Sequence, residues 1–409
     1  MVKIIRGARI FDGTGAEPIS DGIVAIEHGK IIHVGQAASF TEPKQDTQVI
    51  DVGGRTVLPG LIDLHVHLIA SYQRPPEYHI ERAVSASITK ASASCERALR
   101  HGITTVRDVG AGHLGIFALR DAINMGEIRG PRIFAAGKAI SMTGGCHWDV
   151  ICRQADGPDE CRKAAREQLR PLDGIWGTGD GADLIKVFAT DHGYNRTRIQ
   201  LGVDEMTAVV EEAQKQDRRV CAHVGGASGA INCVKAGMHS IEHGNILDEK
   251  SIQAMKDAGT YYVPTLVVYW EPAVLGTSAG FSEQEVGYCR LCYGPHKISF
   301  QMALEAGIKI GAGSDHWEGH PIGRTLHKEL ELMVEYGMRP TAALRAATAV
   351  AAEILGEEAR LGTLEVGKAA DILVVDGNPL VDMAAIQKIW LVMKDGQMLV
   401  DNRFPTGNE

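Results

Sequence analysis

Two histidines separated by a single residue are the first candidates for chemistry in this sequence. His65 and His67 lie in the run PGLIDLHVHL, which starts at Pro59. Alternation along a β-strand directs side chains i and i+2 to the same side, so both imidazoles would face one site. Two neutral ring nitrogens can supply two ligands for zinc or a similar ion. Such a pair can also be two half-buried polar residues, so the rest of the chain must decide.

Three further candidate ligands each follow a short apolar run and precede a loop. They are His223 in VCAHV, His243 in SIEHG and Asp315 in GAGSD. In a barrel of parallel strands, side chains at the C-terminal strand ends converge on one face. A single histidine at a strand end is usually a capping or solvated residue. Four histidines and an aspartate at four strand ends instead predict one metal centre.

Lys186 lies within the apolar run ADLIKVFA, where a charged ammonium group would be costly to bury. A neutral lysine amine can react with carbon dioxide, and the resulting carbamate has two oxygens that can bridge two divalent ions. The ions would in turn stabilise the carbamate. The alternative is a lysine that extends its ammonium group to solvent. The histidines favour the carbamate.

These side chains require parallel strands to position them. The middle of the chain alternates strand-like apolar runs with longer helix-compatible runs, which predicts an α/β fold. Eight strands are predicted, a number that suits a (β/α)8 barrel: 58–68, 103–109, 132–137, 182–189, 219–224, 239–243, 261–268 and 308–315. An open doubly wound sheet competes, because GAGHLG at 110–115 matches a GxGxxG nucleotide motif. In a chain with 47 glycines that match is weak.

The two chain ends have another pattern, short β-rich runs separated by turns. The runs predict antiparallel strands that pair in a small accessory sheet: 2–5, 22–27, 30–34 and 47–52 near the N-terminus, and 370–376, 389–394 and 397–400 near the C-terminus.

Composition restricts the class of protein. The 42 Lys and Arg against 51 Asp and Glu give a net charge of −9, which argues against a nucleic-acid partner. No apolar stretch approaches the roughly 18 residues of a membrane span, and the N-terminal apolar run is too short for a signal peptide, so we expect no membrane partner and a cytoplasmic protein. The eight cysteines are scattered, and Cys289 and Cys292 lack a second CxxC, so reduced thiols are expected.

The motifs PGLIDLHVHL, ADLIKVFAT, CAHVGGASG, SIEHGN and GAGSDH, in this order, resemble the amidohydrolase superfamily over nearly the whole chain. The resemblance implies a distorted (β/α)8 TIM barrel at residues 58–358 and a small composite β-sandwich domain formed from residues 1–57 and 359–409. It also implies two divalent metal ions, with zinc expected. The implied ligands are His65, His67 and Asp315 for one ion and His223 and His243 for the other, with carboxylated Lys186 and a hydroxide bridging them.

Within the superfamily the chain most resembles the dipeptidase-like branch, which includes prolidases and carboxypeptidases that release Lys or Arg, with imidazolonepropionase related to it. The stretch SMTGGCHWD resembles the TGGH loop of that branch, with Cys146 inserted before His147. His147 is thus implied to bind substrate or to stabilise developing negative charge. Prolidase-like members carry a tyrosine where this chain has Gly225. A roomier pocket and poor cleavage of Xaa-Pro are therefore expected.

The predicted function is hydrolysis of an amide bond in a dipeptide or N-acyl amino acid. The bridging hydroxide would attack while Asp315 accepts its proton and returns it to the leaving amine. His147, His192 or the backbone of the glycine-rich loop after His223 (Gly225 to Gly229) would receive the substrate carboxylate. Cyclic amides, carbamates or esters are alternative substrates. Two rival functions are deamination of a heterocycle, which Lys186 argues against, and the role of a catalytically silent scaffold.

The expected partner is a small-molecule substrate, bound by a homo-oligomer. Three scattered aromatic residues could each face a neighbouring subunit, a substrate or the core: Trp270, Tyr288 and Trp317.

Overall fold

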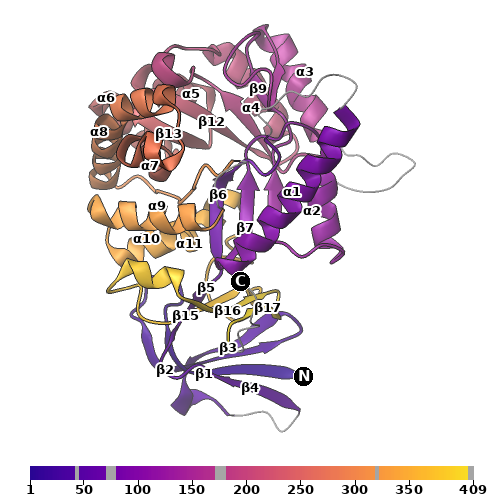
Figure 1. The fold of residues 1–409 in the computed structure, drawn as a ribbon, viewed down its shortest axis with the longest axis vertical. Helices are drawn as coiled ribbons and strands as arrows, with labels where there is room; N and C mark the ends of the chain where they lie inside the picture. Colours follow the sequence, from indigo (N-terminus) through magenta and orange to yellow (C-terminus); the bar gives the residue numbers. More distant parts are fainter. Residues whose placement is uncertain (42–45, 71–79, 171–180, 318–321, 404–409) are drawn as a thin grey trace.

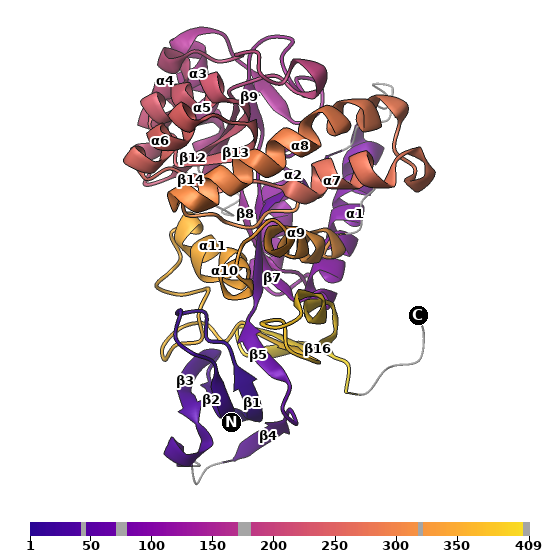
Figure 2. The same cartoon turned by 90° about the vertical axis from the view of Figure 1, so that its left-hand side faces the viewer.

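The computed structural model describes residues 1–41, 46–70, 80–170, 181–317 and 322–403. Parallel strands with helices around them form one part of the molecule, and strands from both chain ends form the other (Figure 1). The side view shows the same division, with β5 running between the two parts (Figure 2). The predicted α/β fold is therefore confirmed.

The parallel strands belong to two sheets. One has the order β6-β7-β8 and the other the order β10-β9-β11-β12-β13-β14. Their bounds are Leu61–Val66 (β6), Ile103–Asp108 (β7), Arg132–Ala135 (β8), Ala139–Ser141 (β9), Cys152–Gln154 (β10), Leu184–Phe188 (β11), Arg219–Gly226 (β12), Ser240–Ile246 (β13) and Tyr261–Val263 (β14).

Backbone hydrogen bonds connect these sheets on both sides. Asp183 donates its N–H to Ala135 O at 2.9 Å, which links the end of β8 to the start of β11. On the other side, Gly311 donates to Tyr262 of β14, and Leu64 of β6 donates to Ala312. Parallel strands joined in this way fit a barrel-like domain.

Helices follow most of the parallel strands. Their bounds are Ile80–Arg100 (α1), Gly115–Asn124 (α2), Gly157–Leu169 (α3), Val203–Gln214 (α4), Ala227–Ala236 (α5), Glu249–Ala258 (α6), Leu266–Leu275 (α7), Glu283–Ala306 (α8), Arg324–Glu335 (α9), Pro340–Ala346 (α10) and Ala349–Leu355 (α11). Local sequence explains several ends. Asp248 accepts from the N–H of Ser251 at the start of α6, and Gly259, with a φ of +67°, ends it. None of the helices among the described residues is long and apolar enough to cross a membrane.

Strands from both chain ends form one sheet with the order β17-β16-β15-β5-β1-β2-β3, and β4 pairs with β1. Their bounds are Val2–Ile10 (β1), Ile19–Glu27 (β2), Lys30–Gln36 (β3), Thr47–Asp51 (β4), Thr56–Pro59 (β5), Ile372–Val375 (β15), Ile389–Lys394 (β16) and Gln397–Asp401 (β17). Tight turns with two residues at positive φ join two of the hairpins, His28-Gly29 between β2 and β3 and Asp395-Gly396 between β16 and β17.

The prediction that the N-terminal strands are all antiparallel was wrong. β1 pairs in parallel with β4 and with β5, and antiparallel only with β2. The physical reason is that β4 does not continue the hairpin series beside β3. The chain returns to the opposite edge of β1, and such a return places β4 in the same direction as β1.

Three of the eight predicted barrel strands differ from the structure. Residues 58–68 include the end of β5, which pairs in the sheet of the chain ends, and only 61–66 form β6 of the α/β part. Residues 261–268 form a strand only to Val263, because Thr265 takes a φ of +51° and α7 begins at Leu266. Residues 308–315 form no continuous strand, although Ile310 and the adjacent His316 make isolated parallel bridges to Tyr262 and Val66. Asp315, with a φ of +51°, breaks the extended backbone there.

Candidate active site

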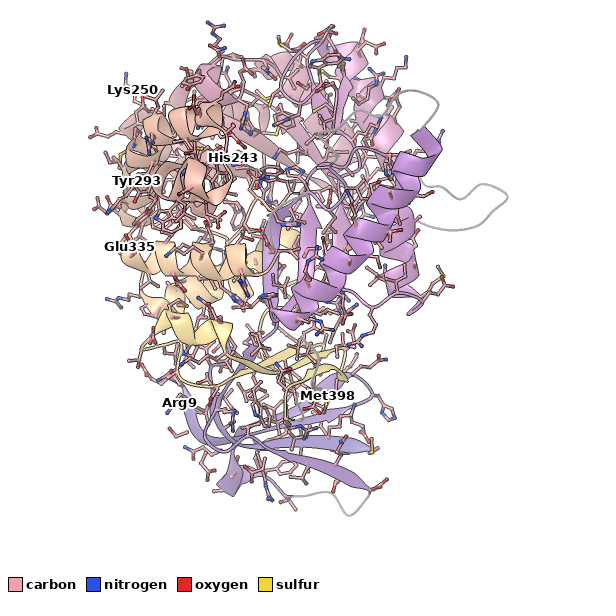
Figure 3. All side chains as sticks on the ribbon, viewed as in Figure 1. Arg9, His243, Lys250, Tyr293, Glu335 and Met398 are labelled. Carbon is pink, nitrogen blue, oxygen red and sulfur yellow. The ribbon has the colours of Figure 1, made fainter. Side chains whose placement is uncertain are left out.

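All six predicted metal ligands line one cavity of about 340 Å³ in the α/β part of the molecule. These are His65, His67, Lys186, His223, His243 and Asp315, and the cavity is also lined by His147 and His192. Figure 3 labels His243, which lies among the strands and helices of this part, whereas Arg9 and Met398 lie in the sheet of the chain ends. The fold thus brings together the six predicted ligands from five separate segments of the sequence.

A buried carboxylate holds the first of these histidines. His65 donates from Nδ1 to Glu242 Oε2 at 2.8 Å, and Arg107 Nη2 donates to the same oxygen at 2.7 Å. Glu242 Oε1 accepts from Ser240 at 2.6 Å, and the Glu242 side chain is fully buried. Because Nδ1 carries the proton, His65 Nε2 has a free lone pair, and this buried nitrogen has no hydrogen-bond partner among the described residues.

The other three histidines are held in the same way by one ring nitrogen. His67 Nδ1 donates to Gly110 O at 2.8 Å, and His223 Nε2 donates to Asp191 O at 3.2 Å. His243 Nδ1 lies 2.7 Å from Thr265 Oγ1. Each contact leaves the second ring nitrogen available, which is how proteins orient histidine ligands of a metal. Gly110, the first glycine of the GxGxxG match, therefore supports a histidine.

Asp315 lies between these rings. Its Oδ1 is 3.5 Å from Nε2 of both His65 and His67, and its Oδ2 is 3.8 Å from His243 Nδ1. Ligand atoms of His65, His243 and Asp315 all lie within 4.8 Å of one another, so these side chains could belong to one metal centre. Asp315 and His243 both have a positive φ, of +51° and +68°. Such strained conformations are typical of functional sites.

Burial favours the neutral form of three of the ligand histidines. Burial lowers the pKa of His65, His223 and His243 well below the ordinary value, and Lys186 acts in the same direction on all three. Burial opposes the charge of Asp315, but His65 and His67 outweigh it, so the pKa of this carboxyl is lowered. Neutral imidazoles and an ionised carboxylate are the forms that bind zinc, so the residues present fit a divalent metal.

Lys186 extends into the cavity from β11. Its side chain is only 1% exposed, and its Nζ lies 5.4 Å from the ring centre of Phe188. No ion pair within the described part of the chain includes it. An ammonium group buried in this way is costly without an anionic partner.

His147 and His192 also line the cavity. Their ring centres are 5.2 Å apart, and His192 lies 6.0 Å from His223. Burial lowers the pKa of His147 to about 4 and that of His192 to about 3, so both rings are neutral near pH 7. His147 also has a positive φ, of +48°. Cys146, the inserted residue, is buried beside it.

The three aromatic residues whose surroundings the sequence did not predict lie in different parts of the structure. Tyr288 and Trp317 line the cavity. Trp270 is half-buried against the main core, with Lys328 Nζ 4.5 Å from its ring centre.

The expectation of a roomier pocket at Gly225 was wrong. A Cβ built on Gly225 would lie 2.7 Å from the Cβ and 2.8 Å from the carbonyl carbon of Arg196. The loop that follows β11 therefore fills the space beside Gly225. The reason for expecting poor cleavage of Xaa-Pro is removed with it.

Sequence reasoning missed four residues at this site: Glu242, Asn245, Arg196 and Tyr269. Glu242 and Asn245 flank His243 on β13, so their place beside a predicted ligand was an available signal. Tyr269 lines the cavity and Arg196 packs against its ring, and neither carries a comparable signal, because only the packing of α7 and of the loop after β11 brings them together.

Comparisons with known proteins agree with this geometry. Residues 56–399 match the family model described as the amidohydrolase family. The chain is 31% identical to ochratoxinase of Aspergillus niger over 95% of this chain and 84% of that protein. It is 24% identical to imidazolonepropionase of Rhizobium rhizogenes over 91% of each chain. A solved structure of a Xaa-Pro dipeptidase with bound methionine in the active site is 32% identical, with a TM-score of 0.85 over 97% of this chain and 99% of that one.

The chain therefore belongs to the amidohydrolase family. The resemblance to the superfamily and to its dipeptidase-like branch, predicted from the motifs, is confirmed. Related proteins in this family hydrolyse carbon–nitrogen bonds of small molecules.

Proposed function

We propose that this protein is a binuclear metal-dependent hydrolase that cleaves an amide bond next to a free carboxylate, as in a dipeptide or an N-acyl amino acid. One observation carries the proposal. Four histidines, each held through one ring nitrogen, line a single cavity together with Asp315 and the buried Lys186. The similarity to a Xaa-Pro dipeptidase supports the substrate class.

The proposed architecture is a distorted (β/α)8 barrel at residues 58–358 and a composite β domain formed from residues 1–57 and 359–409. The hydrogen bonds on both sides of the parallel sheets support the barrel. The pairing of β5 with β15 supports a shared domain of the two chain ends.

His65, His67 and Asp315 would hold one ion, with zinc the metal that these donors favour, and His223 and His243 would hold the other. Lys186, as a carbamate, would bridge them. When bound, such ions make water a stronger acid and polarise the carbonyl of an amide.

Asp315 would act as the proton carrier. Its carboxylate is held in the ionised form by His65 and His67, so it can accept a proton from the attacking water. It would then deliver that proton to the nitrogen of the departing amine, which is a poor leaving group without it. His147 and His192, both neutral, can donate hydrogen bonds to negative charge that develops on the carbonyl oxygen.

Two measurements test the proposal. Metal analysis of the purified protein should give about two divalent ions per chain. A dipeptide with a free C-terminal carboxylate should have a much larger kcat/KM than its C-terminal amide. One ion per chain would favour a deaminase-like site, and no ion would favour a silent scaffold. Equal cleavage of acid and amide, or turnover only of cyclic amides, carbamates or esters, would contradict the substrate class.

A further inference from the structure

A buried arginine lies beside the proposed active site, and no anionic partner for it lies among the described residues. Arg196 directly follows the short helix η3 (Gly193–Asn195), and it is 4% exposed. Its Nε donates to Gly193 O at 2.9 Å, and its Nη1 donates to Asn245 Oδ1 at 3.2 Å. Its buried Nη2 has no acceptor in the part of the chain that the structure describes. A buried guanidinium is costly without an anion, so this arrangement would be stabilised by binding one.

Asn245 supplies a second donor at the same place. This side chain is 1% exposed and lies two residues after His243 on β13. Because arginine can only donate, the contact with Arg196 identifies the asparagine oxygen and leaves Nδ2 as a donor. That Nδ2 is also buried, again with no acceptor in the described part of the chain. Two neighbouring donors, one of them charged, match the two oxygens of a carboxylate.

Aromatic contacts connect this pair to the cavity. The Arg196 Cζ lies 5.1 Å from the ring centre of Tyr269 and 5.4 Å from that of Tyr288, and both rings line the cavity. The Tyr269 ring is 6.0 Å from the ring of His243. The donors are thus separated from a proposed metal ligand by one aromatic side chain.

We propose that Arg196 and Asn245 bind the free carboxylate of the amino acid that leaves the active site. This inference rests on the proposed function and names the residues that select its substrate class. A guanidinium attracts a carboxylate as a full charge, which the neutral His147 and His192 cannot do. Close packing of Arg196 against Gly225 fixes the position of the loop that carries it.

The first test is Arg196→Met, with Arg198→Met as the matched control. Arg198 lies in the same loop and is exposed, and its backbone hydrogen bonds to Asn195 and Asp191 do not involve the side chain. For a free-acid dipeptide, Arg196→Met should lower kcat/KM about a hundredfold, chiefly through KM, because a buried charge pair is lost. The preference for the acid over the C-terminal amide should shrink by a similar factor. Arg198→Met should keep the preference of the wild type.

Asn245→Asp is a second variant of nearly the same shape. Its carboxylate would pair with Arg196 and compete with the substrate, so the preference for the free acid should also be lost. If both variants fold, as judged by circular dichroism, and keep the wild-type preference, the inference is wrong while the proposed function stands.

If the wild type cleaves no dipeptide, a binding measurement tests the carboxylate site separately from the proposed function. L-Leucine and L-leucinamide would be titrated into the metal-loaded wild type and Arg196→Met by calorimetry. The wild type should bind leucine at least tenfold more tightly than leucinamide, and Arg196→Met should lose this difference. That result would support the carboxylate site even if the proposed reaction were wrong. Equal binding by both proteins, or no binding of leucine to the wild type, would overturn it.

Discussion

Glu242→Gln tests whether a buried carboxylate positions the first histidine of the site. The carboxylate accepts from His65 and Arg107 through one oxygen and from Ser240 through the other. Glutamine can reproduce these contacts in shape, with its oxygen toward His65 and Arg107 and its amide toward Ser240. The substitution therefore removes the charge while it keeps the packing.

The expected loss of stability in Glu242→Gln follows from the ion pair that the Glu242 charge makes. Arg107 is 2% exposed, and Glu242 is its ion-pair partner in the structure. Removing one charge of a buried pair costs about 3–5 kcal/mol, and the glutamine oxygen recovers part of this, so we expect about 3 kcal/mol of destabilisation. A neutral partner also makes His65 less basic. Loss of such a partner typically lowers metal affinity about 10–100-fold.

Denaturant unfolding of the metal-free protein and metal competition with a chelator measure the two effects separately. Glu353→Gln is the control, because Glu353 also accepts from a neighbour, Tyr261, and pairs with Lys309, but at a half-exposed position. Its loss should cost under about 1 kcal/mol. The reasoning is refuted if Glu242→Gln unfolds at the same denaturant concentration as Glu353→Gln and binds metal as tightly as the wild type.

Three more predictions concern single side chains. Lys186→Ala should lose activity and part of its metal, and short carboxylic acids should restore some activity; full activity without them would exclude the carbamate. Asp315→Asn should lose much more of its kcat than of its bound metal. A near wild-type kcat with the metals in place would show that another group transfers the proton. Burial raises the pKa of Glu329 from 4.5 to about 8. The folded state thus holds this proton more tightly than the unfolded state, so wild-type stability should fall as pH rises from below about 4.5 to above about 8, by on the order of 5 kcal/mol. Glu329→Gln, which cannot ionise, should lack this fall in denaturant unfolding at several pH values, and an identical pH dependence would contradict the shift.

The sequence alone determined the features that depend on local periodicity. Alternation along a strand directs His65 and His67 to one side, and apolar runs that end in polar residues marked His223, His243 and Asp315 as strand-end side chains. Such patterns depend on backbone geometry over a few residues. The structure brings these side chains into one cavity, while their role as metal ligands stays a prediction.

Only the tertiary structure decided which distant groups meet. His65 contacts Glu242 across 177 positions, and Arg196 contacts Asn245 across 49. The parallel pairing of β1 with β4 and the broken strand before Asp315 were likewise absent from the sequence pattern. These features depend on how elements pack, because a hydrogen-bond partner or a filled space beside Gly225 is supplied by another segment of the chain. The local pattern therefore indicates which residues could do chemistry, and the packing selects the partners that orient them.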